Sequence, residues 1–329
     1  MSDTAVTGRR AAWAGRLGGE ARPVTRAPDA RRALQLALAA IWLLDGVLQY
    51  QSFMFTKAFG QMLSATAGGN PGVIARPIAW NASLVQHHAV PLNTIFATTQ
   101  LLLGLGIAFR PTVRAALAAS IAWAAAVWWF GEGFGGVLNG TASPLGGAPG
   151  AVILYALLAV LLWPAGRAGP FVAARSVGAR TARVLWLVLW LSLAYFALTP
   201  ANRAPGALSS AISDLETGEP GWLAAAGRGA ASLVAGHGLA ASIVLAVVFA
   251  VIAVGVYLPR PAAVACLVLA IVVAAVIWVF GQALGGILTG VGTDPNSGPL
   301  LALLALAYWP CASAGASPAA PADPGSVAP

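Results

Sequence analysis

The chain has 329 residues, of which 59% are hydrophobic and only 9% are charged. An average soluble domain has about 25% charged residues, so this composition excludes a soluble globule and indicates a polytopic membrane protein. The net charge of +8 does not indicate nucleic-acid binding, because the basic residues stand at the ends of apolar runs and not along one face. The two cysteines, Cys266 and Cys311, have no partner at metal-ligand spacing, so neither a disulfide framework nor a zinc site is expected.

Both ends of the sequence differ in composition from the rest. Residues 1–31 are rich in Arg, Ala, Gly and Pro and lack apolar periodicity, which predicts a disordered, basic, cytoplasmic tail. A signal peptide is not expected, since the first apolar run starts after thirty residues and no small-residue cleavage site follows it cleanly. Residues 312–329 are a low-complexity stretch of Ala, Pro and Ser, and we expect a second disordered tail there.

Eight apolar runs lie between these tails. A helix of about 20 residues crosses the hydrocarbon core of a bilayer, and a helix satisfies its own backbone hydrogen bonds there. We therefore predict an all-α membrane protein with eight transmembrane helices. The runs are 33–55, 92–110, 114–133, 148–165, 183–200, 239–258, 262–282 and 298–312.

The basic residues predict how these helices are oriented. With eight crossings and a cytoplasmic N-terminus, the cytoplasmic segments hold 14 basic residues and the outer loops hold four. Because Lys and Arg are enriched on the cytoplasmic side, we expect a multi-pass protein of the inner (plasma) membrane with both termini in the cytoplasm. The four outer residues are Lys57, Arg76, Arg203 and Arg228.

The second half of the chain repeats motifs of the first. The segment "FGEGFGGVLNG" at 130–140 recurs as "FGQALGGILTG" at 280–290, which is 150 positions later. Likewise "GNPG" recurs as "GEPG", and "SLVQHH" as "SLVAGH", both at an offset of 149. Four crossings return the chain to its starting side, so the halves have the same orientation.

This repetition predicts the domain organisation. We expect two parallel four-helix repeats related by a pseudo-two-fold axis along the membrane normal. Their predicted boundaries are 32–166 and 183–311, and a cytoplasmic linker at 167–182 joins them.

The repeated segment carries glycines four residues apart. On a helix, this spacing makes a groove in which a second helix packs closely. In a non-helical segment, the same glycines allow positive φ and a tight turn at the outer end of the span. Both alternatives stay open, and helix packing is the main expectation. The glycines are Gly131, Gly135, Gly136, Gly140, Gly281, Gly285, Gly286 and Gly290.

Four polar residues in or near the spans are candidate ligand contacts. Asp45 lies deep in the first span and Gln49 follows at i+4 on the same helix face, which should point into the bundle. Glu132 and its counterpart Gln282 stand within the two glycine segments. Each acid has a structural alternative. Asp45 would be a buried acid hydrogen-bonded to Trp, Gln or backbone donors, and Glu132 would reach water or cap a neighbouring helix.

The long outer loops predict two amphipathic helices on the outer surface. Asn70 and Glu219 each precede a proline, so each would be an N-cap with Pro in the first turn. His88 and His237 come at the ends of these helices, where a cation interacts favourably with the helix dipole. The alternative is a metal of unknown identity shared by the two histidines and a carboxylate. The possible carboxylates are Glu132, Glu219 and Asp294.

The segments "WLLDGVLQYQ", "GNPG", "FGEGFGGVLNG" and "FGQALGGILTGVGTDPNSGPL" resemble those of multi-pass integral membrane proteins common in actinobacteria, and the resemblance covers most of 33–310. More distantly, each predicted half is similar to the four-helix DoxX-type membrane unit. Some members of that group are accessory subunits of quinone-linked oxidation. The resemblance implies a duplicated DoxX-like unit, and it transfers no catalytic residue to this chain.

The expected function is a non-enzymatic module in the lipid bilayer that binds a small ligand or a partner protein at its extracytoplasmic face. No histidine lies within a predicted span, which argues against bis-histidine haem. One alternative is a DoxX-like redox accessory subunit with quinone as its cofactor. The other is a small-solute transporter whose path at the repeat interface is lined by Asp45 and Glu132. The binding-module hypothesis expects Asp45→Asn to be tolerated and the joint loss of His88 and His237 to abolish binding.

Overall fold

The structure is a computed structural model that describes residues 29–311. Over this range the chain is helical, apart from an isolated bridge between Phe171 and Pro310, which confirms the predicted all-α class. The predicted tails lie outside the described residues except for 29–31. Asp29 is the N-cap of the first helix and accepts a hydrogen bond from the backbone N–H of Arg31. The first helix therefore begins at Ala30, three residues before the first predicted span.

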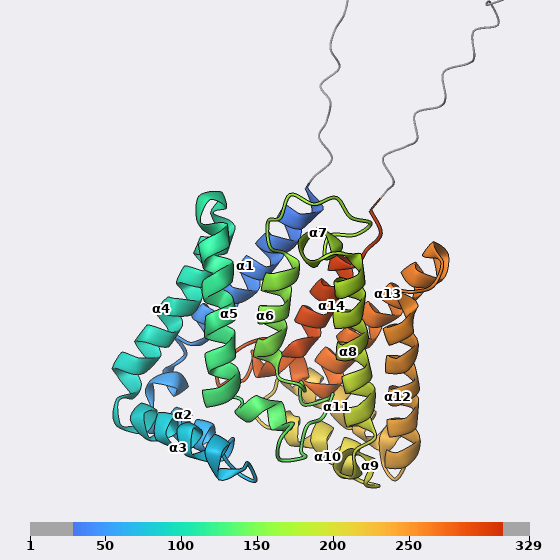
Figure 1. The fold of residues 1–329 in the computed structure, drawn as a ribbon. Coiled ribbons are helices and arrows are strands. Elements are labelled where there is room, and N and C mark those ends of the chain that lie inside the picture. Colours follow the sequence, from blue (N-terminus) through green and yellow to red (C-terminus); the bar gives the residue numbers. More distant parts are fainter. Residues whose placement is uncertain (1–28, 312–329) are drawn as a thin grey trace, which may run out of the picture.

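The bundle lies between the end of the molecule that carries the termini and the opposite end (Figure 1), and it is formed by eight helices, of which α6 and α14 are short. Each of the eight helices overlaps one of the eight predicted apolar runs. They are α1 (Ala30–Leu48), α4 (Ala89–Ala108), α5 (Val113–Phe130), α6 (Ala151–Leu161), α8 (Ala179–Ala197), α12 (Gly238–Gly255), α13 (Arg260–Val276) and α14 (Ser297–Ala307).

Shorter elements connect these helices. Five gather at the end away from the termini, and α7 (Ala174–Val177) lies at the end with the termini (Figure 1). The five are α2 (Lys57–Ala65), α3 (Gly72–His87), α9 (Pro200–Arg203), α10 (Ala207–Ser213) and α11 (Gly221–Val234). One-turn elements are η2 (Ser52–Phe55), η3 (Arg110–Thr112), η4 (Gly133–Gly136), η5 (Asp214–Glu216), η6 (Ile277–Gly281) and η7 (Ala283–Gly286).

Within residues 29–311, five helices are long and apolar enough to cross a membrane. They are Ala89–Ala108, Arg110–Phe130, Ala179–Ala197, Gly238–Gly255 and Arg260–Gly281. These helices support the interpretation of the chain as a membrane protein. The number of eight crossings stays a prediction. Helix α1 has 19 residues but includes three charged side chains, those of Arg31, Arg32 and Asp45. Helices α6 and α14 are apolar but have only 11 residues each.

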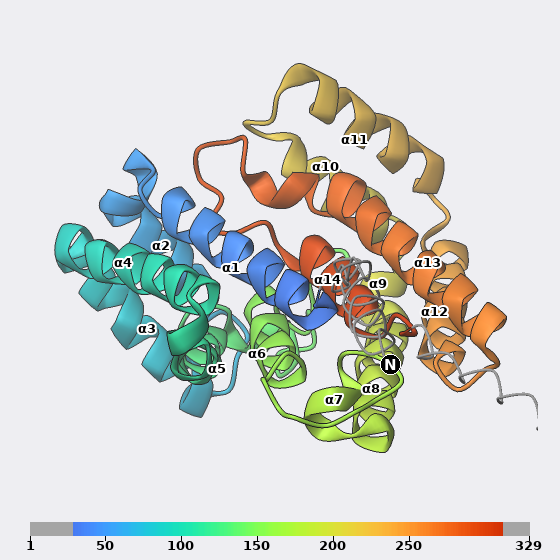
Figure 2. The same ribbon diagram turned by 90° about the horizontal axis from the view of Figure 1, so that it is seen from above.

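The two short helices α6 and α14 contact each other at the centre of the bundle, as the view from above shows (Figure 2). Each buries eight of its 11 residues, as expected for helices that are apolar all round. At 1.5 Å per residue they extend over about 17 Å, roughly half the thickness of a hydrocarbon core of about 30 Å. The glycine segments, which come earlier in the chain than these helices, contain non-helical backbone at Gly135 and Gly285.

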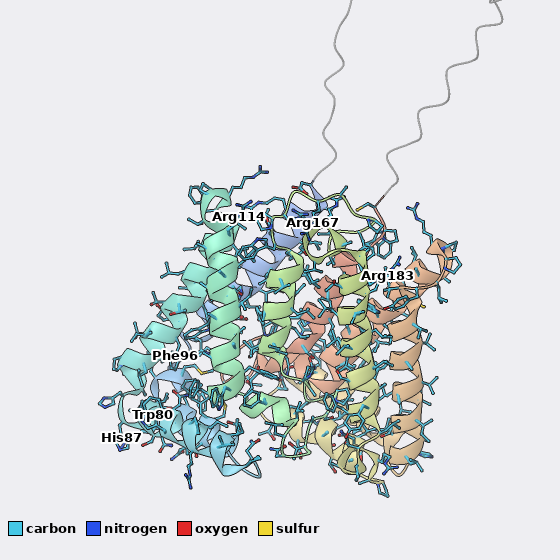
Figure 3. The ribbon with its side chains drawn as sticks, in the orientation of Figure 1. Trp80, His87, Phe96, Arg114, Arg167 and Arg183 are labelled. Carbon is cyan, nitrogen blue, oxygen red and sulfur yellow. The ribbon has the colours of Figure 1, made fainter. Side chains whose placement is uncertain are left out.

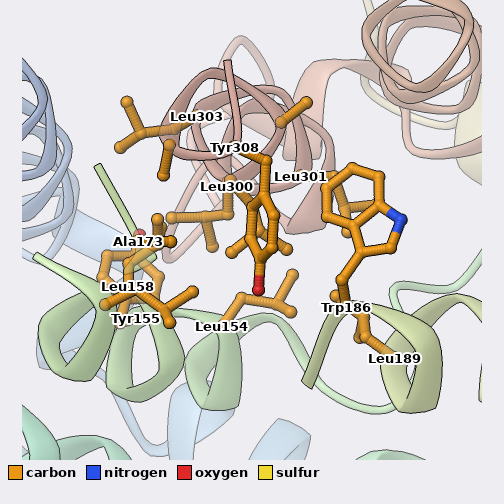
Figure 4. Close-up of a cluster of buried hydrophobic side chains, with 14 of the residues drawn as sticks. Leu154, Tyr155, Leu158, Ala173, Trp186, Leu189, Leu300, Leu301, Leu303 and Tyr308 are labelled. Atoms are coloured by element: carbon orange, nitrogen blue, oxygen red, sulfur yellow. The ribbon is translucent and has the colours of Figure 1, made fainter. Parts of the chain in front are cut away.

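The core joins the two halves of the chain. Leu154 and Leu158 of α6, Trp186 of α8 and Leu300 of α14 are buried in one cluster (Figure 4). The indole Nε1 of Trp186 donates to the carbonyl of Ile252 at 2.9 Å, which satisfies a buried donor within the apolar bundle.

The same pairs of helices are in contact in each half. In the first half α1 contacts α4, α5 contacts α6 and α2 contacts α3; in the second half α8 contacts α12, α13 contacts α14 and α10 contacts α11.

The glycine segments are turns and not the helical packing surfaces that were expected. Gly135, Gly136 and Gly140 have φ between 62° and 78°, and Gly285, Gly286 and Gly290 have φ between 66° and 81°. This left-handed region is sterically open to glycine. The returning chain also passes directly beside the first turn, because a Cβ on Gly135 would lie 2.2 Å from the carbonyl oxygen of Pro149.

We predict that Gly135→Ala lowers the free energy of unfolding by about 2 kcal/mol or more, because it adds a steric clash to an unfavourable φ. Gly140→Ala is the matched control, since Gly140 has φ of +78° but no atom within 4 Å of its hypothetical Cβ. Thermal unfolding of both variants in detergent measures the difference. Equal destabilisation would contradict the close approach at Gly135.

Arginines concentrate at the end of the bundle that carries the termini. Arg114, Arg167 and Arg183 lie at this end, and Trp80 and His87 lie at the opposite end (Figure 3). The spatial separation matches the charge asymmetry of the sequence, which is what the predicted orientation requires.

The surface helices of the outer loops form, but their predicted caps were wrong. The N-cap residues of α3 and α11 are Pro71 and Pro220, each one position after the predicted Asn70 and Glu219. The Asn70 side chain instead donates to the carbonyl of Thr66 at 2.8 Å. A bond to the preceding turn therefore takes the place of the predicted cap.

Candidate functional site

A cavity of about 290 Å³ lies in the first half of the chain, at the end opposite the arginines. Helices α1 to α6 line it, and the loop before α14 supplies two further residues, Thr293 and Asp294. We call it the carboxyl cavity, because three carboxyl side chains reach it and no lysine, arginine or histidine is among its lining residues. The three are Asp45, Glu132 and Asp294.

Asp45 and Gln49 lie on the inward face of α1, as the sequence predicted. They are one helical turn apart and both are buried, with 2% and 5% of their surfaces exposed. The hydroxyl of Tyr155 on α6 is a neighbour of the Asp45 carboxyl group. Gln49 Oε1 has no hydrogen-bond partner among the described residues, and the Tyr155 hydroxyl is the one neighbouring donor for the Asp45 carboxyl group there. The Gln49 oxygen, and the Asp45 oxygen that does not face Tyr155, therefore remain available to an occupant of the cavity.

Glu132 has two different oxygens. Oε1 accepts a hydrogen bond from the backbone N–H of Val152 at 3.1 Å, which is the second residue of α6. This contact satisfies one of the free N–H groups at the start of the helix and places a carboxylate at its positive end. Oε2 is buried and has no partner within residues 29–311. Glu132 therefore caps α6 with one oxygen and leaves the other available.

Gln282 has the equivalent position before α14 but does not line the cavity. Its Oε1 accepts from the N–H of Gly298 at 3.2 Å, and its Nε2 donates to the hydroxyl of Ser297 at 2.7 Å. Gln282 thus performs the same capping with both of its polar atoms engaged. Glu132 and Gln282 therefore share a helix-capping role, and Glu132 alone adds a group that can carry a negative charge.

Asp294 reaches the cavity from the second half of the chain. Its Oδ1 accepts from the backbone N–H of Asn296 at 2.7 Å, and its Oδ2 accepts from the hydroxyl of Thr293 at 2.8 Å. Its charge is close enough to those of Asp45 and Glu132 to interact with both. The loop therefore adds negative potential to a cavity built mainly by the first half.

Glu132 and Asp294 lie in loops outside the helices long enough to cross a membrane. Burial raises the pKa of Glu132 to about 8, the Asp294 carboxyl adds to this rise, and the N–H of Val152 opposes it. Burial also raises the pKa of Asp294 above its ordinary value, against the hydrogen bonds from Thr293 and Asn296. At neutral pH Glu132 is therefore mostly protonated, and a cation placed beside it would favour loss of that proton.

Aromatic side chains form much of the cavity wall. They are Trp42, Phe59, Trp80, Phe96, Trp123, Phe130 and Tyr155. The indole of Trp42 donates to Ser120 at 3.0 Å, whereas Trp123 Nε1 is buried without a partner in the described part of the chain. Aromatic faces next to carboxyl groups are the surroundings that a small organic cation prefers.

The sequence did not single out several lining residues, among them Tyr155, Gln100 and Trp123. A signal for two of them exists. Tyr155 interrupts the aliphatic run "AVILYALLAVL", and Gln100 stands directly before the apolar run "LLLGLGIAF". A polar group in such a run is expected to face the bundle interior or a cavity.

The two histidines do not reach the cavity. His88 is exposed where α3 meets α4, and His237 is exposed where α11 meets α12. These junctions are on opposite sides of the bundle (Figure 2). The His237 ring is within 2.8 Å of the carbonyl of Ala235. Residues 29–311 contain no group of three His, Cys, Asp or Glu side chains that could hold a metal ion, so the predicted shared metal site is not formed by them.

The fold and composition place the chain in the class of helical membrane proteins. No family model matches the chain, and no curated protein or solved structure matches it significantly.

Proposed function

We propose that this protein is a polytopic membrane protein that binds a small organic cation in the carboxyl cavity. One observation supports this most directly: three carboxyl side chains and seven aromatic side chains line a single cavity that no basic side chain lines. An ammonium group gains attraction from carboxylates and from aromatic faces, about 2 kcal/mol or more for a desolvated cation–π contact. The same surroundings repel anions.

The apolar part of the wall limits the ligand to a cation that also has hydrocarbon groups. Phe59, Phe96 and Leu63 line the cavity and offer no ligand atoms to a bare metal ion, which prefers several oxygen ligands. The buried acceptors Asp45 Oδ1, Gln49 Oε1 and Glu132 Oε2 suit the N–H groups or polarised methyl groups of an ammonium. Binding by these residues requires no chemistry, and the proposed role is that of a binding module.

The proposal includes the predicted topology. The chain would cross the inner (plasma) membrane eight times as two parallel repeats related by a pseudo-two-fold axis, with both termini cytoplasmic. Supporting it are the arginine-rich end that carries the termini and the recurrence of the same helix contacts in the two halves. In this orientation the carboxyl cavity lies toward the extracytoplasmic side, where a ligand or a partner protein would reach it.

Choline and its neutral isostere 3,3-dimethylbutan-1-ol test the proposal, since they share shape and differ in charge. We expect choline to raise the unfolding temperature of the purified protein and the alcohol to have no comparable effect, because bound ligand stabilises the folded state. Asp214→Asn is a control for loss of a carboxylate at the same end, because Asp214 is exposed and does not line the cavity. Equal responses to the two compounds would refute cation binding.

A quinone-binding accessory subunit of DoxX type is a second candidate. The buried donor Trp123 Nε1 has no acceptor among the described residues, and a quinone carbonyl would supply one. Under this candidate, the purified protein carries a quinone that is detected by its ultraviolet spectrum and mass, and choline does not displace it.

A further inference from the structure

A second cavity opens at the end of the bundle that carries the termini. Its volume is about 900 Å³, and five of its lining residues are arginines. We call it the arginine pocket. The arginines are Arg31, Arg167, Arg175, Arg183 and Arg260. Arg31 comes from α1, Arg167 and Arg175 from the connection between the two halves, and Arg183 and Arg260 from α8 and α13, so segments distant in sequence build this pocket together.

Among the described residues, positive charge exceeds negative charge in the pocket, although Asp29 acts favourably on the charge of Arg31. Asp29 is the single acid that lines it, and its Oδ1 already accepts from the backbone N–H of Arg31. The one salt bridge found within residues 29–311 is elsewhere, between Arg228 and Glu216. Arg31 and Arg175 are close enough for their charges to repel each other. Holding like charges together is unfavourable unless an anion joins them.

Several guanidinium donors in the pocket have weak partners or none. The Nε atoms of Arg31 and Arg183 are buried and have no hydrogen-bond acceptor among the described residues. Arg175 Nη2 donates to the Cys311 sulfur at 3.0 Å, and thiol sulfur is a weak acceptor. Arg183 faces the ring of Tyr257 with its Cζ 5.9 Å from the ring centroid. Planar arginine donors in excess match the oxygens of a phosphate group.

One wall of the pocket is apolar and borders helices that expose hydrocarbon. Val256, Leu258 and Leu267 line it, from the end of α12 through the first turns of α13. The outward faces of the same two helices expose Val254 and Val268 by 47% and 45%. An amphiphile would therefore place its head on the arginines while its chains follow α12 and α13. Basic pockets between membrane helices on the cytoplasmic side bind anionic lipid headgroups in this way.

We infer that the arginine pocket binds the phosphate group of an anionic molecule, either the headgroup of a membrane phospholipid or a soluble phosphate compound. This site is separate from the carboxyl cavity and does not depend on the cation proposal. Lipid in that position would lie between the two halves of the chain, because residues of both line the pocket.

The test compares two pairs of substitutions in the full-length protein. Arg183→Gln/Arg260→Gln removes two charges from the pocket, and neither side chain donates a hydrogen bond within the described residues, so folding should be retained. Arg110→Gln/Arg180→Gln is the matched control, because both residues are exposed near the same end and line no part of the pocket. If the first pair does not fold, Arg260→Gln alone replaces it, since Arg260 is exposed.

Native mass spectrometry in detergent measures binding of dioleoylphosphatidylglycerol, dioleoylphosphatidylcholine and inorganic pyrophosphate. We expect the anionic phosphatidylglycerol to bind in preference to the zwitterionic phosphatidylcholine. The affinity for phosphatidylglycerol should be at least about tenfold weaker in the pocket pair and should change less than about threefold in the control pair. Displacement of that lipid by pyrophosphate, lost in the pocket pair, would identify a site for soluble phosphates. Equal weakening in both pairs, or equal binding of the two lipids, would overturn the inference, because diffuse surface charge would then explain it.

Discussion

Glu132→Gln is expected to weaken choline binding about 10- to 100-fold while leaving the stability of the protein nearly unchanged. The loss corresponds to roughly 1.4–2.8 kcal/mol, as expected when a partly buried carboxylate no longer faces a cation. The amide oxygen of the new glutamine can still accept from the N–H of Val152, since Gln282 accepts from Gly298 in the same way. Charge and capping are thereby separated in one substitution.

Two further variants complete this comparison. Glu132→Ala removes the cap as well as the charge, so it should lose choline binding and also about 1 kcal/mol of unfolding free energy. Asp214→Asn should bind choline as the unmodified protein does. Calorimetric titration gives the affinities and thermal unfolding gives the stabilities. If Glu132→Gln binds choline with unchanged affinity, the cavity does not recognise its ligand through this carboxylate.

The second large effect is the dependence of choline affinity on pH. Because the pKa of Glu132 is raised to about 8, its ionised fraction falls about tenfold for each pH unit below that value. A bound cation favours the ionised form, so binding releases a proton and weakens as the pH falls. Between pH 9 and pH 6 we expect the affinity to decrease about 100-fold.

The same titration in Glu132→Gln identifies the responsible group. The glutamine has no proton to release, so its pH profile should be nearly flat over this range, apart from a smaller contribution of Asp294, whose pKa is also raised. A steep profile that persists in Glu132→Gln would assign the pH dependence to another carboxyl group. A flat profile in the unmodified protein would contradict the role of Glu132.

Much of the architecture could be predicted from the sequence, because hydrophobic runs and charge distribution report directly on membrane helices. Each predicted run overlaps one long or central helix, and the i, i+4 spacing of Asp45 and Gln49 correctly placed both on the inward face of α1. The predicted runs 148–165 and 298–312 were only slightly short for a membrane crossing, whereas α6 and α14 have 11 residues each. The glycine turns before these helices depend on a close approach to Pro149 and Pro295, which no local pattern encodes.

The site was harder to predict than the fold, since a cavity depends on contacts between distant segments. Asp294 and Asp45 line the same cavity although 249 positions separate them (294 − 45), and the sequence linked Asp294 to the histidines instead. The histidine pairing was inferred from matching positions in the repeat, but matching positions on opposite sides of a bundle need not meet. Tyr155 was overlooked because a single polar residue in an apolar run indicates burial and not which partner it faces.

A cryo-electron microscopy map of the full-length protein with saturating choline tests the central claim most directly. We expect ligand density inside the carboxyl cavity, with the ammonium beside Glu132 Oε2 and in contact with the aromatic wall. Density at another position, or an empty cavity at a choline concentration that stabilises the protein, would contradict it.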